Sequence, residues 1–172
     1  MRTNLLFFLA CLVFLSSCKD AQEQPSTDDT ETSENQNLTE QDLAKLKYTD
    51  YILDEQAKNL MKNSGEYTQL QELISNIKLG DLSFFETSKE TQKGLFKNLR
   101  QTLPNGLNTE SVLARILVLD TKFHQLESLY NLSTTTKDEL LKNTKEFLVA
   151  FSNLNLQMNK KMEFDNRTIE KP

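Results

Sequence analysis

The sequence predicts an all-α fold, an antiparallel bundle of about five helices, and three observations support this prediction. From Leu38 onward the apolar residues recur at intervals of three and four, which is the spacing of an amphipathic helix face. The period-two alternation typical of strands is not sustained, and glycine, proline and tryptophan are scarce, with 4, 3 and 0 residues. About 135 residues follow position 37, which is enough for one domain with its own apolar core.

The first helix is expected to begin at Thr39 and to continue to a stop near Gly65. Asp42, three residues after Thr39, makes a weaker relative of a capping box, which satisfies the free N–H groups at a helix start. The apolar stripe of this helix consists of Leu43, Leu46, Leu53, Ala57 and Leu60.

Two shorter helices are expected next. The second carries Tyr67, Leu70, Leu73, Ile74 and Ile77, and it ends at Gly80 because glycine tolerates the left-handed conformation that often follows a helix. The third is capped by Asp81 or Ser83 and closes at Pro104. Its stripe consists of Gln92, Phe96, Leu99 and Leu103.

The last two helices have the strongest periodicity. One is capped by Asn108 or Thr109 and the other follows Ser133–Thr136. Their seams resemble those of coiled coils, and consist of Val112, Ile116, Leu119, Phe123, Leu126 and Tyr130 in the first and Leu140, Thr144, Phe147, Phe151, Leu154 and Met158 in the second. We expect Leu113, Leu117, Leu141 and Leu148 to widen the two seams, which favours a compact antiparallel bundle.

The first residues of the chain have the features of a secretory signal. Arg2 is followed by an uncharged apolar run over 5–15, which at about 1.5 Å per residue is too short to span a hydrocarbon core of about 30 Å. The run leads into Leu15-Ser16-Ser17-Cys18, which resembles the lipobox of bacterial lipoproteins. This resemblance implies that residues 1–17 are removed and that Cys18, carrying diacylglycerol, becomes the first mature residue and anchors the protein to a membrane.

A polar, acidic segment separates Cys18 from the bundle. Residues 18–37 contain no large apolar residue, so we expect a disordered tether before a bundle over 38–163 and a frayed tail over 164–172. The tether holds six acids against Lys19, so the net charge of −5 resides there and the bundle is nearly neutral. A neutral bundle argues against nucleic-acid binding, which requires a basic face. The resemblance favours the cell envelope and outer membrane, with the periplasmic face preferred to the cell surface.

The cysteine count excludes several chemistries from the mature domain. Cys11 lies in the signal and Cys18 carries lipid, so no disulfide, thiolate metal site or cysteine nucleophile is available. We expect no cofactor. The oligomeric state is left open by the sequence.

The only histidine, His124, lies one turn after Asp120 and three residues before Glu127. Such carboxylates can orient an imidazole as a general base or share a metal with it, but the paired Glu-x-x-His motifs of a bundle di-iron site are absent, since Thr121 stands where Glu is required. A helix-flank histidine with polar neighbours is the simpler interpretation. Arg115, in an apolar neighbourhood, is a candidate for a structural ion pair or for binding an anionic ligand.

Four apolar residues are candidate partner contacts. Adjacent residues on a helix point about 100° apart, so one of Phe84 and Phe85 is expected to pack inward while the other anchors a partner, unless the preceding loop covers both. Asn155 interrupts the apolar strip of the last helix. It either fixes helix register or marks an end where Leu156 and Met158 face a partner.

Beyond the lipobox, Ser111–Ile116 and Leu154–Asn159 resemble stretches of small helical lipoproteins of Gram-negative envelopes, and this resemblance carries no function with it. Two hypotheses follow. The first is a non-enzymatic interaction or accessory module of the envelope with a protein partner. The alternative is a binder of a small amphiphile in the bundle core or, less favoured, a hydrolase that uses His124.

Overall fold

The computed structural model describes residues 37–86 and 89–167, with side chains from position 94 onward in the second range. The signal peptide, Cys18, nearly all of the predicted tether and residues 168–172 of the predicted tail lie outside the described residues. Within them the chain is all-helical and contains six α-helices and one short 3-10 helix, which confirms the predicted fold class.

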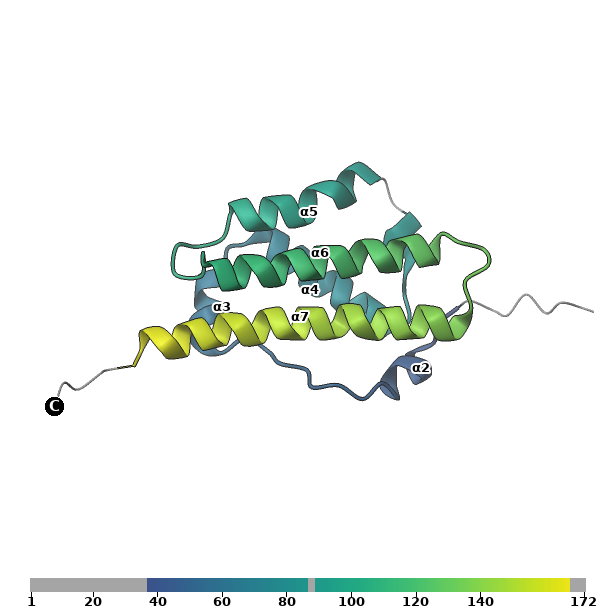
Figure 1. The fold of residues 1–172 in the computed structure, drawn as a ribbon, viewed down its shortest axis with the longest axis horizontal. Helices are drawn as coiled ribbons and strands as arrows, with labels where there is room; N and C mark the ends of the chain where they lie inside the picture. Colours follow the sequence, from purple (N-terminus) through teal and green to yellow (C-terminus); the bar gives the residue numbers. More distant parts are fainter. Residues whose placement is uncertain (1–36, 87–88, 168–172) are drawn as a thin grey trace, which may run out of the picture. The chain divides into compact units, whose positions relative to one another are not determined.

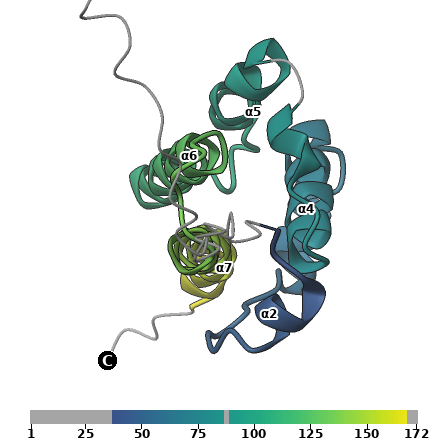
Figure 2. The ribbon, with the colours of Figure 1, turned by 90° about the vertical axis from the view of Figure 1, so that its right-hand side faces the viewer.

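Four helices form the bundle, and each follows its neighbour in the chain (Figures 1 and 2). α4 (Gly65–Lys78) packs on α5 (Lys89–Gln101), α5 packs on α6 (Glu110–Tyr130), and α6 packs along α7 (Lys137–Asp165) in the most extensive contact of the domain. Figure 1 shows α6 and α7 side by side and antiparallel. The short helices α2 (Glu40–Ala44) and α3 (Glu55–Met61) both contact α7. They lie on the side of α7 that α6 leaves open.

Most helix starts are where the capping residues predict them. Thr109 and Thr136 accept hydrogen bonds from the third residue of α6 and α7, and Thr136 forms a full capping box with Glu139. Thr39 forms the same box with Asp42 in α2. The third predicted helix instead begins as a 3-10 turn, Ser83–Glu86, before α5. These caps fix the ends of α2, α6 and α7 at the expected residues.

Gly80 ends α4 as predicted. It has φ +88°, and the N–H groups of Gly80 and Asp81 donate to the carbonyl oxygens of Ile77 and Asn76 in a Schellman motif. A Cβ at Gly80 would lie 2.7 Å from the backbone oxygen of Leu38. Glycine is therefore required both by the backbone angle and by the close approach of the chain entering α2.

Phe123 is the centre of the core. Its ring lies 5.2–6.0 Å from the rings of Phe84, Phe85, Phe96 and Phe147, which come from the 3-10 helix, α5 and α7. All the seam residues predicted for α6 and α7 are buried except Tyr130, which is half-buried. Leu148 is buried as expected, but Leu117 is 58% exposed, because α6 buries only one stripe and Leu117 lies off it.

The predicted first helix is wrong in its middle. Residues 46–54 have no regular secondary structure and run as a drawn-out segment from α2 to α3 (Figure 1), and Gly65 begins α4 rather than ending a helix. The reason lies in the run Lys47-Tyr48-Thr49-Asp50-Tyr51-Ile52, whose β-branched and aromatic residues favour extended backbone. Asp54 then caps α3 by accepting a hydrogen bond from the N–H of Ala57 at 2.8 Å.

We call residues 46–54 the strap, because polar side chains of α7 hold its backbone alongside that helix (Figure 1). The N–H of Tyr51 donates to Oγ of Ser152 at 2.8 Å, and that hydroxyl donates to the carbonyl oxygen of Thr49 at 2.7 Å. The side-chain amide of Asn155 donates to the carbonyl oxygen of Tyr51 at 2.8 Å. Side chains of α7 thus supply hydrogen bonds to backbone N–H and C=O groups of the strap, which has no partner strand.

Two further contacts complete the attachment of the strap. Asn159 accepts a hydrogen bond from the N–H of Asp54 at 2.9 Å and donates one to the carbonyl oxygen of Ile52 at 2.8 Å. Ser152, Asn155 and Asn159 are spaced by three and four residues, so they form one stripe of α7. The interpretation of Asn155 as a residue that fixes register is thereby supported, because its side chain binds both the Tyr51 carbonyl of the strap and the Tyr67 hydroxyl of α4.

Candidate functional site

The candidate site is a groove between α6 and α7 on the side facing away from the core. It has a volume of about 580 Å³. From α6 it is lined by Val118 and Lys122, and from α7 by Lys142, Lys145, Glu146, Val149, Ala150 and Asn153. Apolar side chains therefore lie between charged ones, as in surfaces that bind amphipathic segments.

Beside this groove, one exposed stripe of α6 carries no charge after Glu110. Five exposed, uncharged residues share one face of the helix, because they lie one, three or four positions apart. They are Ala114, Leu117, Val118, Thr121 and Gln125. Leu117 and Val118 are 58% and 45% exposed. Leu117 and Val118 therefore form a small exposed apolar patch in this uncharged stripe.

The groove is positively charged. Nζ of Lys122 on α6 lies 2.8 Å from Oε2 of Glu146 on α7, and this hydrogen bond holds the pKa of the Glu146 carboxyl below its usual value. Lys142 and Lys145 form no ion pair with a described residue. Three ammonium groups thus face one carboxylate that is already paired, which leaves a net positive rim.

No motif in the sequence marks this groove. Two signals in the sequence point to it: the uncharged spacing of Ala114, Leu117, Val118 and Thr121, and the pair Lys142 and Lys145 one turn apart. Neither signal shows that the two helices place these residues together. That information comes from the antiparallel register of α6 and α7.

His124 is exposed, and carboxylates of its own helix occupy both ring nitrogens. Nδ1 lies 2.9 Å from Oε2 of Glu127 and Nε2 lies 3.3 Å from Oδ1 of Asp120. The other oxygen of Asp120 accepts a hydrogen bond from Nη1 of Arg100 on α5 at 3.0 Å. This arrangement links α5 to α6, and neither imidazole nitrogen is directed at a hydroxyl nucleophile.

Arg115 is exposed and forms no ion pair with a described residue, so the expected structural pair is not seen. It lies seven residues, or two helical turns, before Lys122 on the same side of α6. Its guanidinium therefore extends the positive side of α6 beyond the groove, consistent with the alternative hypothesis of an anion-binding residue.

Phe84 and Phe85 both pack toward the core. Phe85 is buried against Phe123 and Tyr130, with ring centroids 5.3 and 5.6 Å away. Phe84 is half-buried and meets Phe123 edge-on at 6.0 Å. The expectation that one of the pair is an exposed anchor is replaced by the alternative, in which both are covered.

The far end of α7 does not present the predicted partner surface. Met158 is 1% exposed and belongs to the core, and Leu156 is half-buried. The amphipathic period places Met158 in the same buried stripe as Leu154, which explains why it is unavailable to a partner.

None of the helices in the described residues combines the length and the apolar character of a membrane span. No group of three or more histidine, cysteine, aspartate or glutamate side chains in this part of the chain is arranged to hold a metal ion. Comparison of the chain with protein-family models, curated proteins and solved structures finds no match.

Proposed function

We propose that this chain is a non-enzymatic, lipid-anchored protein of the cell envelope that binds a partner protein through the groove between α6 and α7. The observation that carries the proposal is the groove itself, in which Val118, Val149 and Ala150 lie between Lys122, Lys142 and Lys145. The partner segment that fits these features is an amphipathic helix with an acidic flank.

The shape of the groove favours a helix as the occupant. Two antiparallel helices leave a long furrow between them, and a third helix can place apolar residues at intervals of three and four into such a furrow. Leu117 and Val118 would add apolar contact beside it. Binding would bury side chains that are otherwise exposed to water, and each Å² of apolar surface buried contributes about 25 cal/mol of favourable free energy.

Charge supports an acidic partner. Lys142 and Lys145 form no close ion pair with a described residue, although the charge of Lys142 acts on Glu139 and Glu146, whereas Lys122 is paired directly with Glu146. Aspartate or glutamate on the partner helix would pair with the ammonium groups of Lys142 and Lys145. Such pairs at the edge of an interface contribute mainly to association rate and orientation, so binding is expected to weaken as salt is raised.

The anchor and the location rest on the resemblance of Leu15–Cys18 to a lipobox, which lies outside the described residues. We infer attachment to the outer membrane through lipid on Cys18, with the domain on the periplasmic face. Metabolic labelling with palmitate tests this inference. The label is expected in the full-length chain and not in Cys18→Ser, and equal labelling of both would contradict it.

The non-enzymatic part of the proposal is supported by the geometry at His124. Asp120 and Glu127 occupy both imidazole nitrogens, and Arg100 holds Asp120 in turn. The alternative of an amphiphile in the bundle core has less support, because Phe96, Phe123 and Phe147 fill the core.

Site-specific photo-crosslinking in cells tests the partner. A benzoyl-phenylalanine at Val118 is expected to capture one protein, and the same probe at exposed Glu72 on α4 serves as the control. Lys142→Glu with Lys145→Glu should abolish the adduct at Val118, whereas Lys97→Glu on α5 should not. Adducts only to lipid, only to a second copy of the chain, or equally from both probe positions would overturn the proposal.

A further inference from the structure

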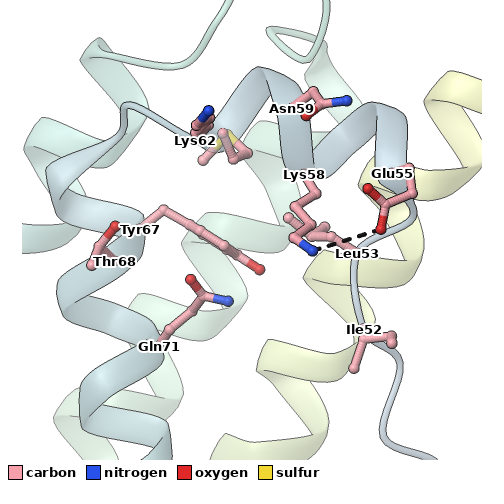
Figure 3. A pocket seen from close by; sticks show the side chains of 10 residues that line it. Ile52, Leu53, Glu55, Lys58, Asn59, Lys62, Tyr67, Thr68 and Gln71 are labelled. Carbon is pink, nitrogen blue, oxygen red and sulfur yellow. Dashed lines mark ion pairs between the residues drawn. The ribbon is translucent and has the colours of Figure 1, made fainter.

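A second pocket lies on another part of the domain, between the end of the strap, α3 and the first turns of α4 (Figure 3). Its volume is about 510 Å³, within the range of about 300–1,000 Å³ typical of small-molecule sites. It shares no residue with the α6–α7 groove, so it is independent of the proposed function.

The inner wall of this pocket is apolar and rigid. Tyr67 and Met61 are each 3% exposed, and Leu53 is half-buried. Figure 3 shows Tyr67 reaching from α4 toward the middle of the pocket. Its hydroxyl donates to Asn155 at 2.7 Å and its ring stacks on Phe151 at 6.0 Å, so the ring is held in place before any ligand arrives.

The rim of the pocket is polar and largely without partners. Lys62, Asn59 and Gln71 line it, and their side chains form no hydrogen bond or ion pair with a described residue. Lys58 pairs only with Glu55, at 3.6 Å and with both side chains mostly exposed, an interaction that contributes little. Two ammonium groups, two carboxamides and one carboxylate therefore surround an apolar floor.

We propose that this pocket binds a small organic anion with a flat apolar body, such as an aromatic carboxylate or sulfonate. The apolar body would lie against Tyr67, Met61 and Leu53. The anionic group would meet Lys58, and the carboxamide of Gln71 would hydrogen-bond its remaining polar atoms, while Lys62 and Asn59 at the edge of the pocket add positive charge and a further polar group. A preformed floor lowers the ordering cost of binding.

The experiment compares an anionic probe with a neutral probe of similar shape. The full chain is titrated with 8-anilinonaphthalene-1-sulfonate and, separately, with N-phenyl-1-naphthylamine, and probe fluorescence is recorded. The double variant Lys58→Ala/Lys62→Ala is expected to weaken sulfonate binding by about tenfold while changing binding of the neutral probe less than about twofold. The control Lys47→Ala/Lys97→Ala removes the same charge from exposed positions and should leave sulfonate binding unchanged.

Nuclear magnetic resonance locates the bound probe. The side-chain amide signals of Asn59 and Gln71 are expected to shift on addition of the sulfonate, and unchanged circular dichroism of each variant shows that it remains folded. Signal shifts centred on Val118 and Val149 instead would overturn the proposal. So would an equal loss of affinity for the two probes in the double variant, or an equal loss of sulfonate affinity in the control variant. Failure of this test would not affect the partner-binding proposal, because the crosslinking experiment reports on the other face.

Discussion

Replacing Asn155 by alanine tests whether α7 holds the strap. Asn155 is 3% exposed, and its side chain accepts a hydrogen bond from the Tyr67 hydroxyl at 2.7 Å and donates one to the Tyr51 carbonyl at 2.8 Å. Alanine would leave both groups without a partner. Each buried group that loses its hydrogen bond costs about 1–3 kcal/mol. Two such groups are affected, but water can partly replace the lost bond at the Tyr51 carbonyl. We therefore expect the free energy of unfolding to fall by about 2–4 kcal/mol.

A double-mutant cycle separates the shared hydrogen bond from other effects. Tyr67→Phe removes only the hydroxyl and is expected to cost about 1–2 kcal/mol. Because both variants lose the same bond, the double variant should be more stable than the sum of the two losses predicts, by about 1–2 kcal/mol. Urea unfolding followed by circular dichroism at 222 nm measures all three free energies.

Asn153 provides a matched control on the same helix. It is half-buried beside the groove and has no hydrogen bond to a described side chain or strap residue, so Asn153→Ala should change stability by less than about 0.5 kcal/mol. If Asn155→Ala cost no more than Asn153→Ala, or if the coupling to Tyr67 were near zero, the strap would not depend on this network and the reasoning would be refuted.

Three further predictions concern the helix ends and the core, and urea unfolding measures each. Gly80→Ala should lower the free energy of unfolding by at least about 1–2 kcal/mol, because φ is +88° and a Cβ would lie 2.7 Å from a backbone oxygen. Gly65→Ala, with open space around the residue, should be neutral or stabilising by up to about 1 kcal/mol. Similar losses of stability in both variants would contradict the role of Gly80. The hydrogen bond from Lys137 holds the pKa of Asp42 well below its usual value, so this carboxylate stabilises the fold above pH ~4 and its contribution is lost as the pH falls. Asp42→Asn should therefore be less stable than wild type near neutral pH, and the difference in the free energy of unfolding should narrow toward pH ~2. A difference that stayed constant with pH would exclude this linkage. Phe123→Ala should cost about 3–5 kcal/mol, because it empties the centre of the aromatic core, and a loss below about 1 kcal/mol would show that this cluster is not the main support of the bundle.

The parts of the fold that local chemistry determines could be predicted from the sequence. Thr109, Thr136 and Gly80 end or begin helices through contacts within a few residues of themselves. The buried stripes of α6 and α7 follow from a period sustained over several turns, so the all-α bundle is predictable with them.

The strap could not be predicted, because it depends on residues about a hundred positions away. The spacing from Leu43 to Leu60 fits a helix, and only the run from Tyr48 to Ile52 favours extended backbone. What decides the outcome is Ser152, Asn155 and Asn159, which offer hydrogen bonds that a helix over 46–54 could not use. Asn155 stands out in the sequence as a polar residue in an apolar strip, but the sequence does not reveal its partners, Tyr51 and Tyr67.

The candidate site could not be predicted from the sequence for a related reason. A groove depends on the register between two helices, and residues that are individually ordinary, such as Lys142 and Val149, become a site only when α6 lies beside α7. Phe84 and Met158 looked like candidate contacts because they are large and apolar, yet the same property draws them into the core.

The attachment of the strap to α7 also sets an order of events during synthesis. The ribosome releases the chain from its N-terminus, so residues 46–54 emerge about a hundred residues before Ser152, Asn155 and Asn159 exist. Until then their backbone has only water as a partner, so this early segment of the domain reaches its final place only after α7 has been made. A truncated chain that stops before Ser152 is therefore expected to leave residues 46–54 open to proteases, even where α4, α5 and α6 have already formed.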